Sequence, residues 1–362
     1  MPTPRSDWFK SAPSTATSEK ADTPLFPFLV KLLRGEDLTA KEAAEFFRAM
    51  TSGESGSNQV AAALTALTAK GETYEEFAGM ASVMRDLAVK VRAPKNAMDI
   101  AGTGSSTAKT FNISTAAAIV AAGAGLNLAK QCNRGVTSKS GSADVLAELG
   151  VKIANDPTMA QTSLNTGTCF LFSPKFHPEL RRLADIRGRL GIRTCLNILG
   201  LLANPASVSR HLIGVWHQSL VLPTAEALAM LKAHTAWVVH GEDGLDEVTL
   251  TGKTHAAAVK DGHVRSYVVT PKDFGLKAAS IDHLKTTTVK ESAAIIRDIL
   301  ASKRRDEARS IVVLNAATAL IVGGLATDPM HAARLAEQSI DSGQAQNKLE
   351  RLIQITNKKP LA

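Results

Sequence analysis

The stretch from Asp99 to Asp144 constrains the fold of this 362-residue chain most tightly. It joins a short apolar segment at 98–101, a loop of glycine, serine and threonine, a helix of small residues, a second strand at 126–129 and a second polar loop. Strands that each end in a polar loop are typical of parallel α/β sheets, which bind ligands at the carboxyl ends of their strands. Glycines, hydroxyls and free backbone N–H groups suit phosphate. The stretch therefore predicts a site for a phosphate ester.

The composition is that of an ordinary globular protein, with 44% hydrophobic and 21% charged residues. The most apolar segment, 310–326, is interrupted by Asn315 and two glycines, and it is shorter than the roughly 20 residues of a membrane span. The 42 Lys and Arg residues exceed the 34 Asp and Glu residues without forming a basic tract, which favours small anions over nucleic acid as ligands. Three cysteines without a CxxC spacing indicate a reducing, cytoplasmic location.

Three segments follow from the order of these patterns: a disordered leader, a small helical domain and a larger α/β domain with a mostly parallel central sheet. Their expected bounds are 1–24, 25–92 and 93–362. The helical domain contains four short helices, two of which start at capping boxes, Thr39 to Glu42 and Thr73 to Glu76. Helices near 180–215 are expected to pack on this small domain.

Within the α/β domain, the alternation of β-branched and Ala-rich segments predicts further strands and helices. The expected strands lie at 151–153, 169–172 and 237–240, and the expected helices at 142–149, 158–166, 291–301, 308–326, 331–342 and 344–355.

Two polar loops carry most of the candidate binding groups. Residues 102–106 (GTGSS) and 110–115 (TFNIST) precede a helix, whose dipole and free N–H groups favour an anion. The same residues are also compatible with a simple turn and helix caps. Lys130 and Arg134 follow the second strand with Asn133 between them, and they suit either the same anion or a solvated lysine and a structural arginine.

An acidic pair follows the strand expected at 237–240. Asp246 and Glu247 are adjacent carboxylates after a Gly turn, and hard oxygen ligands on a loop suit Mg²⁺ beside a polyphosphate. Adjacent acids on a loop are also commonly just solvated. His177, which precedes Pro178, suits an anchored turn histidine better than a catalytic base.

Taken in order, these motifs resemble the anthranilate phosphoribosyltransferase family. The family pattern of GTGGD, TFNIST, KHGNR, GSAD, HP, LGxRT, NxLGPLxNP and GxDGxDE is met at 102–106, 110–115, 130–134, 141–144, 177–178, 190–194, 197–205 and 241–247. The resemblance implies transfer of phosphoribosyl from phosphoribosyl pyrophosphate (PRPP) to anthranilate, an aromatic amine, with release of pyrophosphate and with Mg²⁺, as in tryptophan biosynthesis. It also implies a homodimer whose subunits each hold the site between a small α lobe and a larger α/β lobe.

The resemblance further implies a role for particular residues. Catalysis falls on Lys130, Asn133 and Arg187. PRPP binding falls on Gly102, Ser105, Ser106, Thr110, Asn112, Ser114, Thr115, Lys130, Ser138 and Ser142. Acceptor binding falls on Gly102, Gln131, Cys132, Asn133, His177 and Arg187, and metal ligation on Ser114, Asp246 and Glu247. An arginine fork is the natural partner of the acceptor carboxylate.

The chain departs from the family pattern in three motifs. Ser105 and Ser106 replace Gly and Asp, so that a carboxylate near the ribose, pyrophosphate or metal is missing. Gln131 and Cys132 replace His and Gly, and Leu201 replaces Pro. Because the PRPP and metal sets otherwise match, the changes affect the identity of the acceptor more than the reaction class. If the backbone at Cys132 required a positive φ, its side chain would also bring strain.

Two alternative functions stay open on the sequence alone. One is the same transfer to a different aromatic amine. The other is a non-catalytic, nucleic-acid-binding relative, which Ser106 and the net charge of +8 favour and the presence of Lys130, Asp246 and Glu247 disfavours. A pyrimidine nucleoside phosphorylase is disfavoured, because the extra C-terminal domain of those enzymes is missing.

Overall fold

The computed structural model describes residues 23–104, 108–135 and 141–358 and divides the chain into two compact units. Unit 1 comprises the chain up to Ala88 together with His177–Ala203. Unit 2 comprises Val89–Phe176 and the chain from Asn204 onward. Nearly all of the leader expected at 1–24 lies outside the described residues.

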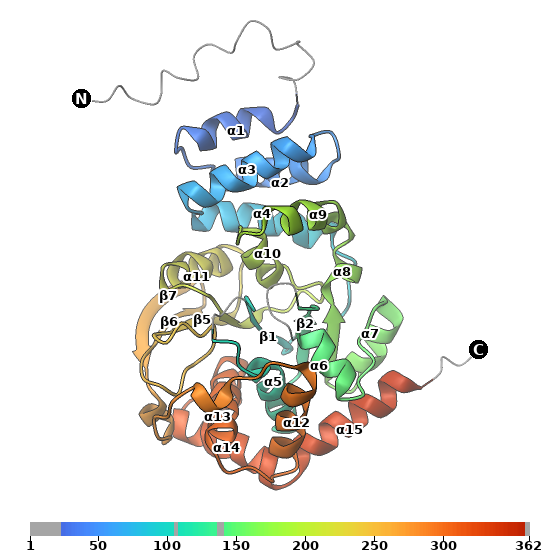
Figure 1. Cartoon of the computed structure of the whole chain (residues 1–362), viewed down its shortest axis with the longest axis vertical. Helices are drawn as coiled ribbons and strands as arrows, with labels where there is room; N and C mark the ends of the chain where they lie inside the picture. Colours follow the sequence, from blue (N-terminus) through green and yellow to red (C-terminus); the bar gives the residue numbers. More distant parts are fainter. Residues whose placement is uncertain (1–22, 105–107, 136–140, 359–362) are drawn as a thin grey trace, which may run out of the picture. The chain divides into compact units, whose positions relative to one another are not determined.

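Unit 1 is helical (Figure 1). Its helices are α1 (Phe26–Leu33), α2 (Ala40–Thr51), α3 (Ser57–Lys70), α4 (Tyr74–Leu87), α9 (Arg181–Leu190) and α10 (Leu196–Leu202). The four helices expected before residue 92 are confirmed, and both capping boxes form: the side chains of Thr39 and Thr73 accept hydrogen bonds from the backbone N–H groups of Glu42 and Glu76. Glu76 is fully buried and pairs with Lys70 at 3.0 Å, which compensates its charge.

Unit 2 is built on a seven-stranded sheet in the order β3-β2-β1-β4-β5-β6-β7. The strands are β1 (Met98–Gly102), β2 (Leu128–Cys132), β3 (Thr168–Phe172), β4 (Arg210–Gly214), β5 (Thr235–Gly241), β6 (Thr254–Lys260) and β7 (His263–Val269). The first five strands in this order are parallel, whereas β6 and β7 are antiparallel. The expected fold, a small helical domain with a larger α/β domain and a mostly parallel sheet, is therefore confirmed.

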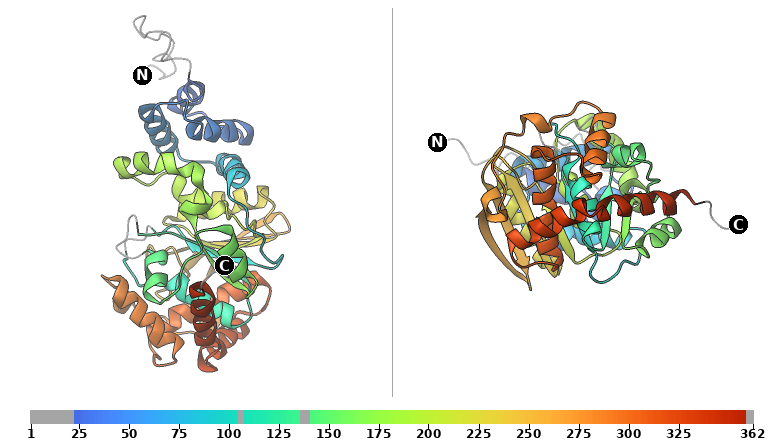
Figure 2. Two further views of the ribbon diagram at one scale, coloured as in Figure 1. Left: turned by 90° about the vertical axis from the view of Figure 1, so that its right-hand side faces the viewer. Right: turned by 90° about the horizontal axis from the view of Figure 1, so that it is seen from below.

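Helices cover the sheet of unit 2. They are α5 (Ile113–Gly123), α6 (Ser142–Glu148), α7 (Pro157–Leu164), α8 (Ser173–Phe176), α11 (Val221–Met230), α12 (Val289–Leu300), α13 (Glu307–Gly323), α14 (Pro329–Asp341) and α15 (Gln344–Asn357). In Figure 2 the orange and red helices, α12 to α15, gather together, and α13 packs against α5 and against β4 and β5. None of the helices in the described ranges has the length and hydrophobicity that a bilayer span requires.

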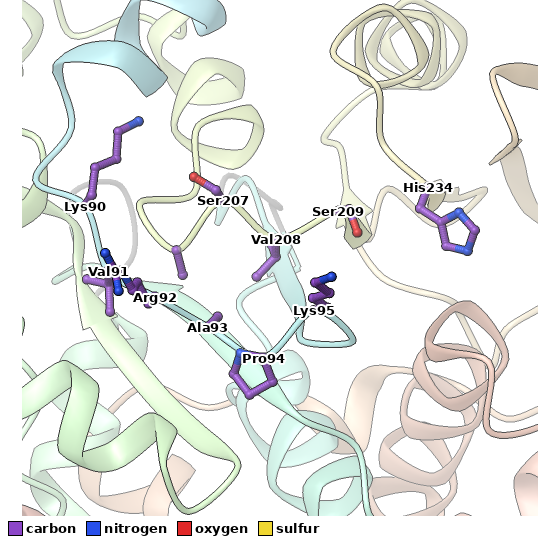
Figure 3. A pocket seen from close by; sticks show the side chains of 11 residues that line it. Lys90, Val91, Arg92, Ala93, Pro94, Lys95, Ser207, Val208, Ser209 and His234 are labelled. Atoms are coloured by element: carbon purple, nitrogen blue, oxygen red, sulfur yellow. The ribbon is translucent and has the colours of Figure 1, made fainter.

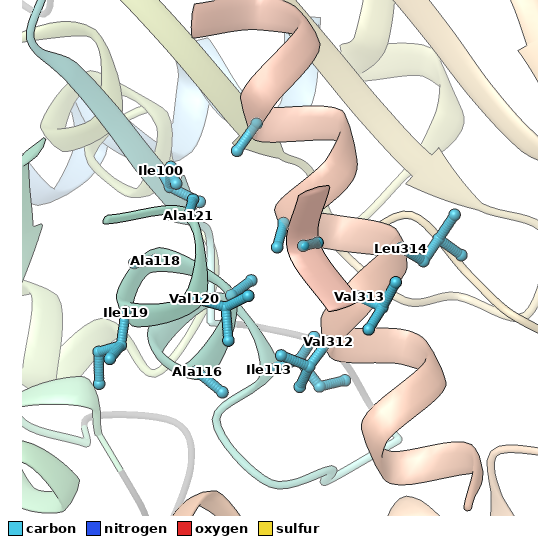
Figure 4. Packing of buried hydrophobic residues seen from close by; sticks show 14 of the residues in the cluster. Ile100, Ile113, Ala116, Ala118, Ile119, Val120, Ala121, Val312, Val313 and Leu314 are labelled. Atoms are coloured by element: carbon cyan, nitrogen blue, oxygen red, sulfur yellow. The ribbon is translucent and has the colours of Figure 1, made fainter. Parts of the chain in front are cut away.

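The core of unit 2 lies where α5 and α13 meet. Both helices are buried over most of their length, because their sequences are rich in Ala, Val and Ile. Figure 4 shows Ile113 and Val120 of α5 near Val312 and Val313 of α13. Burying each side chain of this size contributes roughly 1.5–3 kcal/mol relative to exposure, so this contact holds the N-terminal end of α5 in place beside the strand ends.

The structure corrects several sequence expectations. The strand expected at 126–129 begins two residues later, because Leu126 closes the turn after α5 through a 3.0 Å hydrogen bond to the carbonyl of Ala121. Residues 151–153 form no strand, because the N–H of Val151 closes the turn after α6 on the carbonyl of Leu146 at 2.9 Å and the N–H of Lys152 donates to Thr356 Oγ1 at 3.2 Å. The next residue, Ala154, forms a β-bridge with Leu171. Strands β4, β6 and β7 were not expected.

Candidate functional site

The loop that follows β5 is held on the glycine-rich loop that follows β1. Oδ2 of the buried Asp246 accepts hydrogen bonds from Thr103 Oγ1 at 2.9 Å and from the backbone N–H of Gly104 at 2.7 Å. A Cβ atom on Gly214 would lie 1.6 Å from the carbonyl oxygen of Asp246, and one on Gly102 would lie 2.9 Å from Oδ2. The two glycines at the ends of β1 and β4 therefore leave the space that the acidic loop occupies.

The neighbouring carboxylate binds the first turn of α5. The backbone N–H of Ser114 donates a 3.1 Å hydrogen bond to Oε1 of Glu247. N–H groups at this end of a helix have no partner within the helix, so they are available to an anion. Burial, together with the nearby charge of Asp246, raises the pKa of Glu247 to about 8 against the lowering effects of Lys130 and Ser114.

Lys130 lies within β2 and is 2% exposed. Its Nζ donates to the carbonyl oxygen of Ile100 in β1. Burial lowers the pKa of Lys130, and the negative charges of Asp99, Glu247 and Asp246 oppose that effect. Lys130 is thus a buried amine within the sheet, near enough to Asp99, Glu247 and Asp246 for their charges to favour its protonated form.

The donor set at this edge fits Mg²⁺. Asp246, Glu247 and the hydroxyl of Ser114 offer hard oxygen ligands, and Asp246 and Glu247 are adjacent carboxylates whose charges repel each other. In the described part of the chain no group of three or more His, Cys, Asp and Glu side chains is gathered for a metal. A Mg²⁺ ion held by few carboxylates takes its other ligands from water and substrate phosphates.

A buried polar network, which was not predicted, lies next to Lys130. Asp99 accepts hydrogen bonds from the backbone N–H of Gln131 at 3.2 Å and from Asn204 Nδ2 at 2.7 Å. Asn204 Nδ2 also donates to the carbonyl of Ala129 at 2.7 Å. Burial raises the pKa of Asp99 to about 6, against the lowering effect of Lys130. An aspartate inside an otherwise apolar strand was the available signal.

The loop after β2 is tied to the start of α6. Asn133, which is exposed, accepts a 3.0 Å hydrogen bond at its carbonyl oxygen from Ala143, and its N–H donates to Ser142 Oγ at 3.3 Å. Oδ2 of Asp144 accepts from the N–H groups of Gly135 and Gly141 at 3.0 and 3.2 Å. The GSAD motif therefore closes this loop. Among the expected PRPP-binding residues, Ser105, Ser106 and Ser138 lie outside the described residues.

Gln131 and Cys132, the two residues that depart from the KHGNR motif, are buried in β2. Gln131 Oε1 accepts a 3.1 Å hydrogen bond from Ser173 Oγ. The thiol of Cys132 lies 3.2 Å from the carbonyl of Leu171, and burial raises the pKa of this thiol. Cys132 does not have a positive φ, so the backbone strain considered from the sequence does not arise.

The TFNIST segment is fixed against α12 and the core. Oδ1 of Asn112 accepts a 2.9 Å hydrogen bond from Ser292 Oγ, and Asn112 does not cap α5 with its side chain. Thr110 forms a β-bridge with Lys285. Thr115 is fully buried, and its hydroxyl has no hydrogen-bond partner among the described residues.

Two of the expected acceptor-binding residues belong to unit 1. His177 is buried, and its Nδ1 lies 2.9 Å from Glu179 Oε1. Arg187 in α9 is half-buried, and burial lowers the pKa of its guanidinium. Asp185 on the same helix pairs with Arg189 at 3.1 Å. Arg187 makes no ion pair within the described ranges, which leaves a partly desolvated guanidinium available to an anionic ligand.

Family models match both parts of the chain. Residues 94–346 match the model described as "Glycosyl transferase family, a/b domain". Residues 26–88 match the model described as "Glycosyl transferase family, helical bundle domain".

Curated proteins with similar sequences include anthranilate phosphoribosyltransferases from several bacteria. The chain is 41% identical over 333 residues to the anthranilate phosphoribosyltransferase of Xanthobacter autotrophicus, which covers 92% of this chain and 96% of the relative. It is 43% identical over 329 residues to the anthranilate phosphoribosyltransferase of Clostridium kluyveri, which covers 90% of this chain and 98% of the relative.

Solved structures agree. The anthranilate phosphoribosyltransferase of Thermus thermophilus superposes with a TM-score of 0.86 at 36% identity, covering 91% of this chain and 99% of that one. The enzyme of Saccharomyces cerevisiae in complex with PRPP and Mg superposes with a TM-score of 0.81 at 26% identity, covering 93% and 99%. The same yeast enzyme is also known in complex with 4-fluoroanthranilate, with a TM-score of 0.80 and 26% identity over 92% and 97% of the chains.

Proposed function

Because this chain belongs to the anthranilate phosphoribosyltransferase family, we propose that it transfers the phosphoribosyl group of PRPP to anthranilate with release of pyrophosphate. The relatives confirm three expectations from the sequence: the family, the pentosyltransferase activity and the use of Mg²⁺. The observation that carries the proposal is the position of Asp246, which is hydrogen-bonded to the glycine-rich loop while Glu247 binds the start of α5.

The reaction exchanges one bond at the ribose C1′ atom. The bond from C1′ to pyrophosphate breaks, a bond from C1′ to the amine nitrogen forms, and the amine loses one proton. Positive charge develops on the ribose and negative charge on the leaving pyrophosphate. A bound Mg²⁺ would neutralise part of the negative charge on the pyrophosphate.

We assign the chain's own groups to these charges. Asp246, Glu247 and Ser114 hold the cation, with the two carboxylates fixed by the N–H groups of Gly104 and Ser114. The other N–H groups and hydroxyls of the glycine-rich loop and of the first turn of α5 bind phosphate oxygens. Lys130, in the middle of β2, adds positive charge near these groups, because the carboxylates of Asp99, Glu247 and Asp246 favour its protonated form. The remaining PRPP-binding assignments, Ser105, Ser106, Thr110, Asn112, Thr115, Ser138 and Ser142, stay predictions.

For the acceptor we assign the carboxylate to Arg187. Its half-buried guanidinium has no ion pair in the described ranges, and a bidentate arginine–carboxylate pair is both strong and directional. Asn133, with its exposed side chain, supplies a second polar contact for the amine. Gly102, Gln131, Cys132 and His177 stay predictions for the acceptor pocket.

We further propose that the chain acts as a cytoplasmic homodimer. The cytoplasmic location is supported by the three cysteines, Cys132, Cys169 and Cys195, which are all free and buried.

The dimer is supported by α1, whose sequence FPFLVKLL is almost entirely apolar although only Leu32 is buried. Phe26 and Leu33, seven residues apart and therefore on one face of the helix, are 36% and 45% exposed.

The test of the proposed function is pyrophosphate release from PRPP with a panel of aromatic amines, measured with and without Mg²⁺. We expect anthranilate to give the highest kcat/KM, and we expect release to require both the amine and Mg²⁺. Two results would contradict the assignment. One is pyrophosphate release that does not depend on the amine. The other is a kcat/KM more than tenfold higher for an aromatic amine that has no carboxylate beside the amino group than for anthranilate.

A further inference from the structure

A cavity of about 800 Å³ lies at the amino-terminal edge of the sheet of unit 2, opposite to the edge that carries the site described above. Its walls are the segment that leads into β1, the segment that leads into β4 and the residue before β5 (Figure 3). The lining residues are Lys90, Val91, Arg92, Ala93, Pro94, Lys95, Ala206, Ser207, Val208, Ser209 and His234. We call it the basic cavity.

The position of the basic cavity separates it from the reaction site. β1, β4 and β5 are neighbouring parallel strands, so all three begin at one edge and end at the other. β1 is five residues long, and at about 3.3 Å per residue the two edges are roughly 16 Å apart. Groups that line the cavity therefore do not contact a ligand bound at Asp246.

The lining of the basic cavity is positively charged. Lys90, Arg92 and Lys95 come from one six-residue segment, and His234 comes from the turn before β5. No lining residue is acidic. Among the described residues, the acid that pairs with a lining residue is Asp261, whose Oδ1 lies 3.7 Å from Nδ1 of His234. Arg92 and Lys95 form no ion pair with any described residue, so their charges are available.

The floor of the basic cavity is apolar and firmly held. Val91, Ala206 and Val208 are 7%, 6% and 7% exposed and belong to one hydrophobic cluster. The N–H of Val91 donates to the carbonyl of Pro205 at 3.2 Å, which joins the two walls. Ser207 has a φ of +49°, a conformation that non-glycine residues seldom adopt and that the surrounding hydrogen bonds maintain.

We propose that the basic cavity binds a phosphorylated small molecule with an apolar body. A single carboxylate is satisfied by one arginine fork, whereas a phosphate presents three oxygens and up to two charges and therefore matches several cations together. The hydroxyls of Ser207 and Ser209, which have no hydrogen-bond partner among the described residues, add two donors. The apolar floor accepts the organic part, as in most small-molecule sites.

The test uses the full-length protein with ¹³C-labelled valine methyl groups and phenyl phosphate as the probe. We expect the methyl signals of Val91 and Val208, which line the floor, to shift in proportion to occupancy. The variant Arg92→Ala/Lys95→Ala should weaken phenyl phosphate binding at least tenfold at these signals. Its turnover of PRPP should equal that of the wild type, because neither residue is assigned to the reaction.

The matched control is Lys277→Ala, which removes an exposed lysine of the same unit outside the cavity. It should bind phenyl phosphate as the wild type does. The proposal is overturned if phenyl phosphate leaves the Val91 and Val208 signals unmoved, or if the double variant binds it with unchanged affinity. If inorganic phosphate binds as tightly as phenyl phosphate, the apolar floor contributes nothing and the organic part of the proposal is wrong.

Discussion

At the scale of single residues, the site depends on charges that are held partly away from water. Asp246 and Glu247 lie on the loop after β5, Lys130 lies in β2, and burial shifts the pKa of both Glu247 and Lys130 toward the neutral form. Arg187 lies in α9 of unit 1, where burial lowers the pKa of its guanidinium. Local motifs predicted Asp246, Glu247 and Lys130, because each follows a glycine turn or an expected strand, whereas the role of Arg187 came from the family resemblance. Asp99 and Asn204 were missed, since their partnership spans 105 residues of sequence.

Replacing Glu247 with alanine should remove most of the activity at low Mg²⁺. A lost ligand carboxylate leaves the pyrophosphate charge less compensated, which costs about 3 kcal/mol in transition-state binding, or roughly a hundredfold in kcat/KM. The measurement is pyrophosphate release across a Mg²⁺ titration, with Glu242→Ala, an exposed acid of the same loop, as the control. Kinetics that match the wild type at every Mg²⁺ concentration would remove Glu247 from the metal site.

Replacing Arg187 with alanine should weaken the acceptor and leave PRPP almost unaffected. The charge-assisted pair contributes roughly 1.5–3 kcal/mol, so the KM for anthranilate should rise about 10- to 150-fold. Arg189→Ala is the matched control on the same helix, because its partner Asp185 and its own side chain are largely exposed. A higher KM for PRPP with an unchanged KM for anthranilate would show that Arg187 has another role.

At the scale of elements, the site is made by loops that follow β1, β2 and β5 and by the start of α5. The β-branched and alanine-rich patterns located most of these elements, but β4 was missed because its five residues, RHLIG, carry little pattern of their own. The hairpin of β6 and β7 was also missed, although its turn contains Asp261–Gly262, both with positive φ. An Asp-Gly pair between alternating strands is a strong hairpin signal, so this hairpin was predictable from the sequence.

Gly214 is the position where the backbone of β4 admits the acidic loop, so Gly214→Ala should displace that loop. With its Cβ 1.6 Å from the carbonyl oxygen of Asp246, alanine forces the loop to move, and we expect at least a tenfold higher Mg²⁺ requirement. Gly102→Ala should show the same effect more weakly, because its Cβ would lie 2.9 Å from Oδ2 and 3.2 Å from the carbonyl oxygen of Asp246, farther than the 1.6 Å at Gly214.

Gly188→Ala serves as the control for these glycine substitutions, because a Cβ there meets nothing within 4 Å and the residue lies in α9. It should leave the Mg²⁺ requirement unchanged and should raise helix stability by about 0.5–1 kcal/mol. Circular dichroism checks that each variant is folded. If folded Gly214→Ala keeps the wild-type Mg²⁺ dependence, the close approach of the loop has no functional role.

At the scale of the whole molecule, the chain forms two units of different character, and unit 1 is discontinuous in sequence, which is what the expected packing of helices near 180–215 on the small domain requires. Unit 1 takes α9 and α10 from beyond residue 176, so two segments far apart in sequence fold together. A capping box describes one helix, whereas which helices pack together depends on contacts between residues that are distant in the chain. The order of the motifs predicted the family and, through it, the activity. It did not predict contacts between residues distant in the chain, such as the hydrogen bond from Ser173 to Gln131.

The proposed dimer should be sensitive to charge on α1. Light scattering should give twice the 38.2 kDa mass of one chain for the wild type, and close to the single mass for Phe26→Glu/Leu33→Glu, since two buried carboxylates oppose association. Leu222→Glu is the control, because Leu222 in α11 is 44% exposed, similar to the 45% of Leu33. A wild type of single-chain mass, or a double variant that keeps the doubled mass, would contradict the dimer.

The hydrogen bond between Thr103 and Asp246 joins residues that are 143 positions apart. During synthesis, the glycine-rich loop therefore exists long before the carboxylate that completes it. Contacts of such separation form late in folding, because the loop they close costs entropy that is recovered only when neighbouring strands are already paired. Mg²⁺ affinity in this protein should consequently appear in the last phase of refolding, so that a metal-sensitive probe reports the completed sheet and stays silent for intermediates.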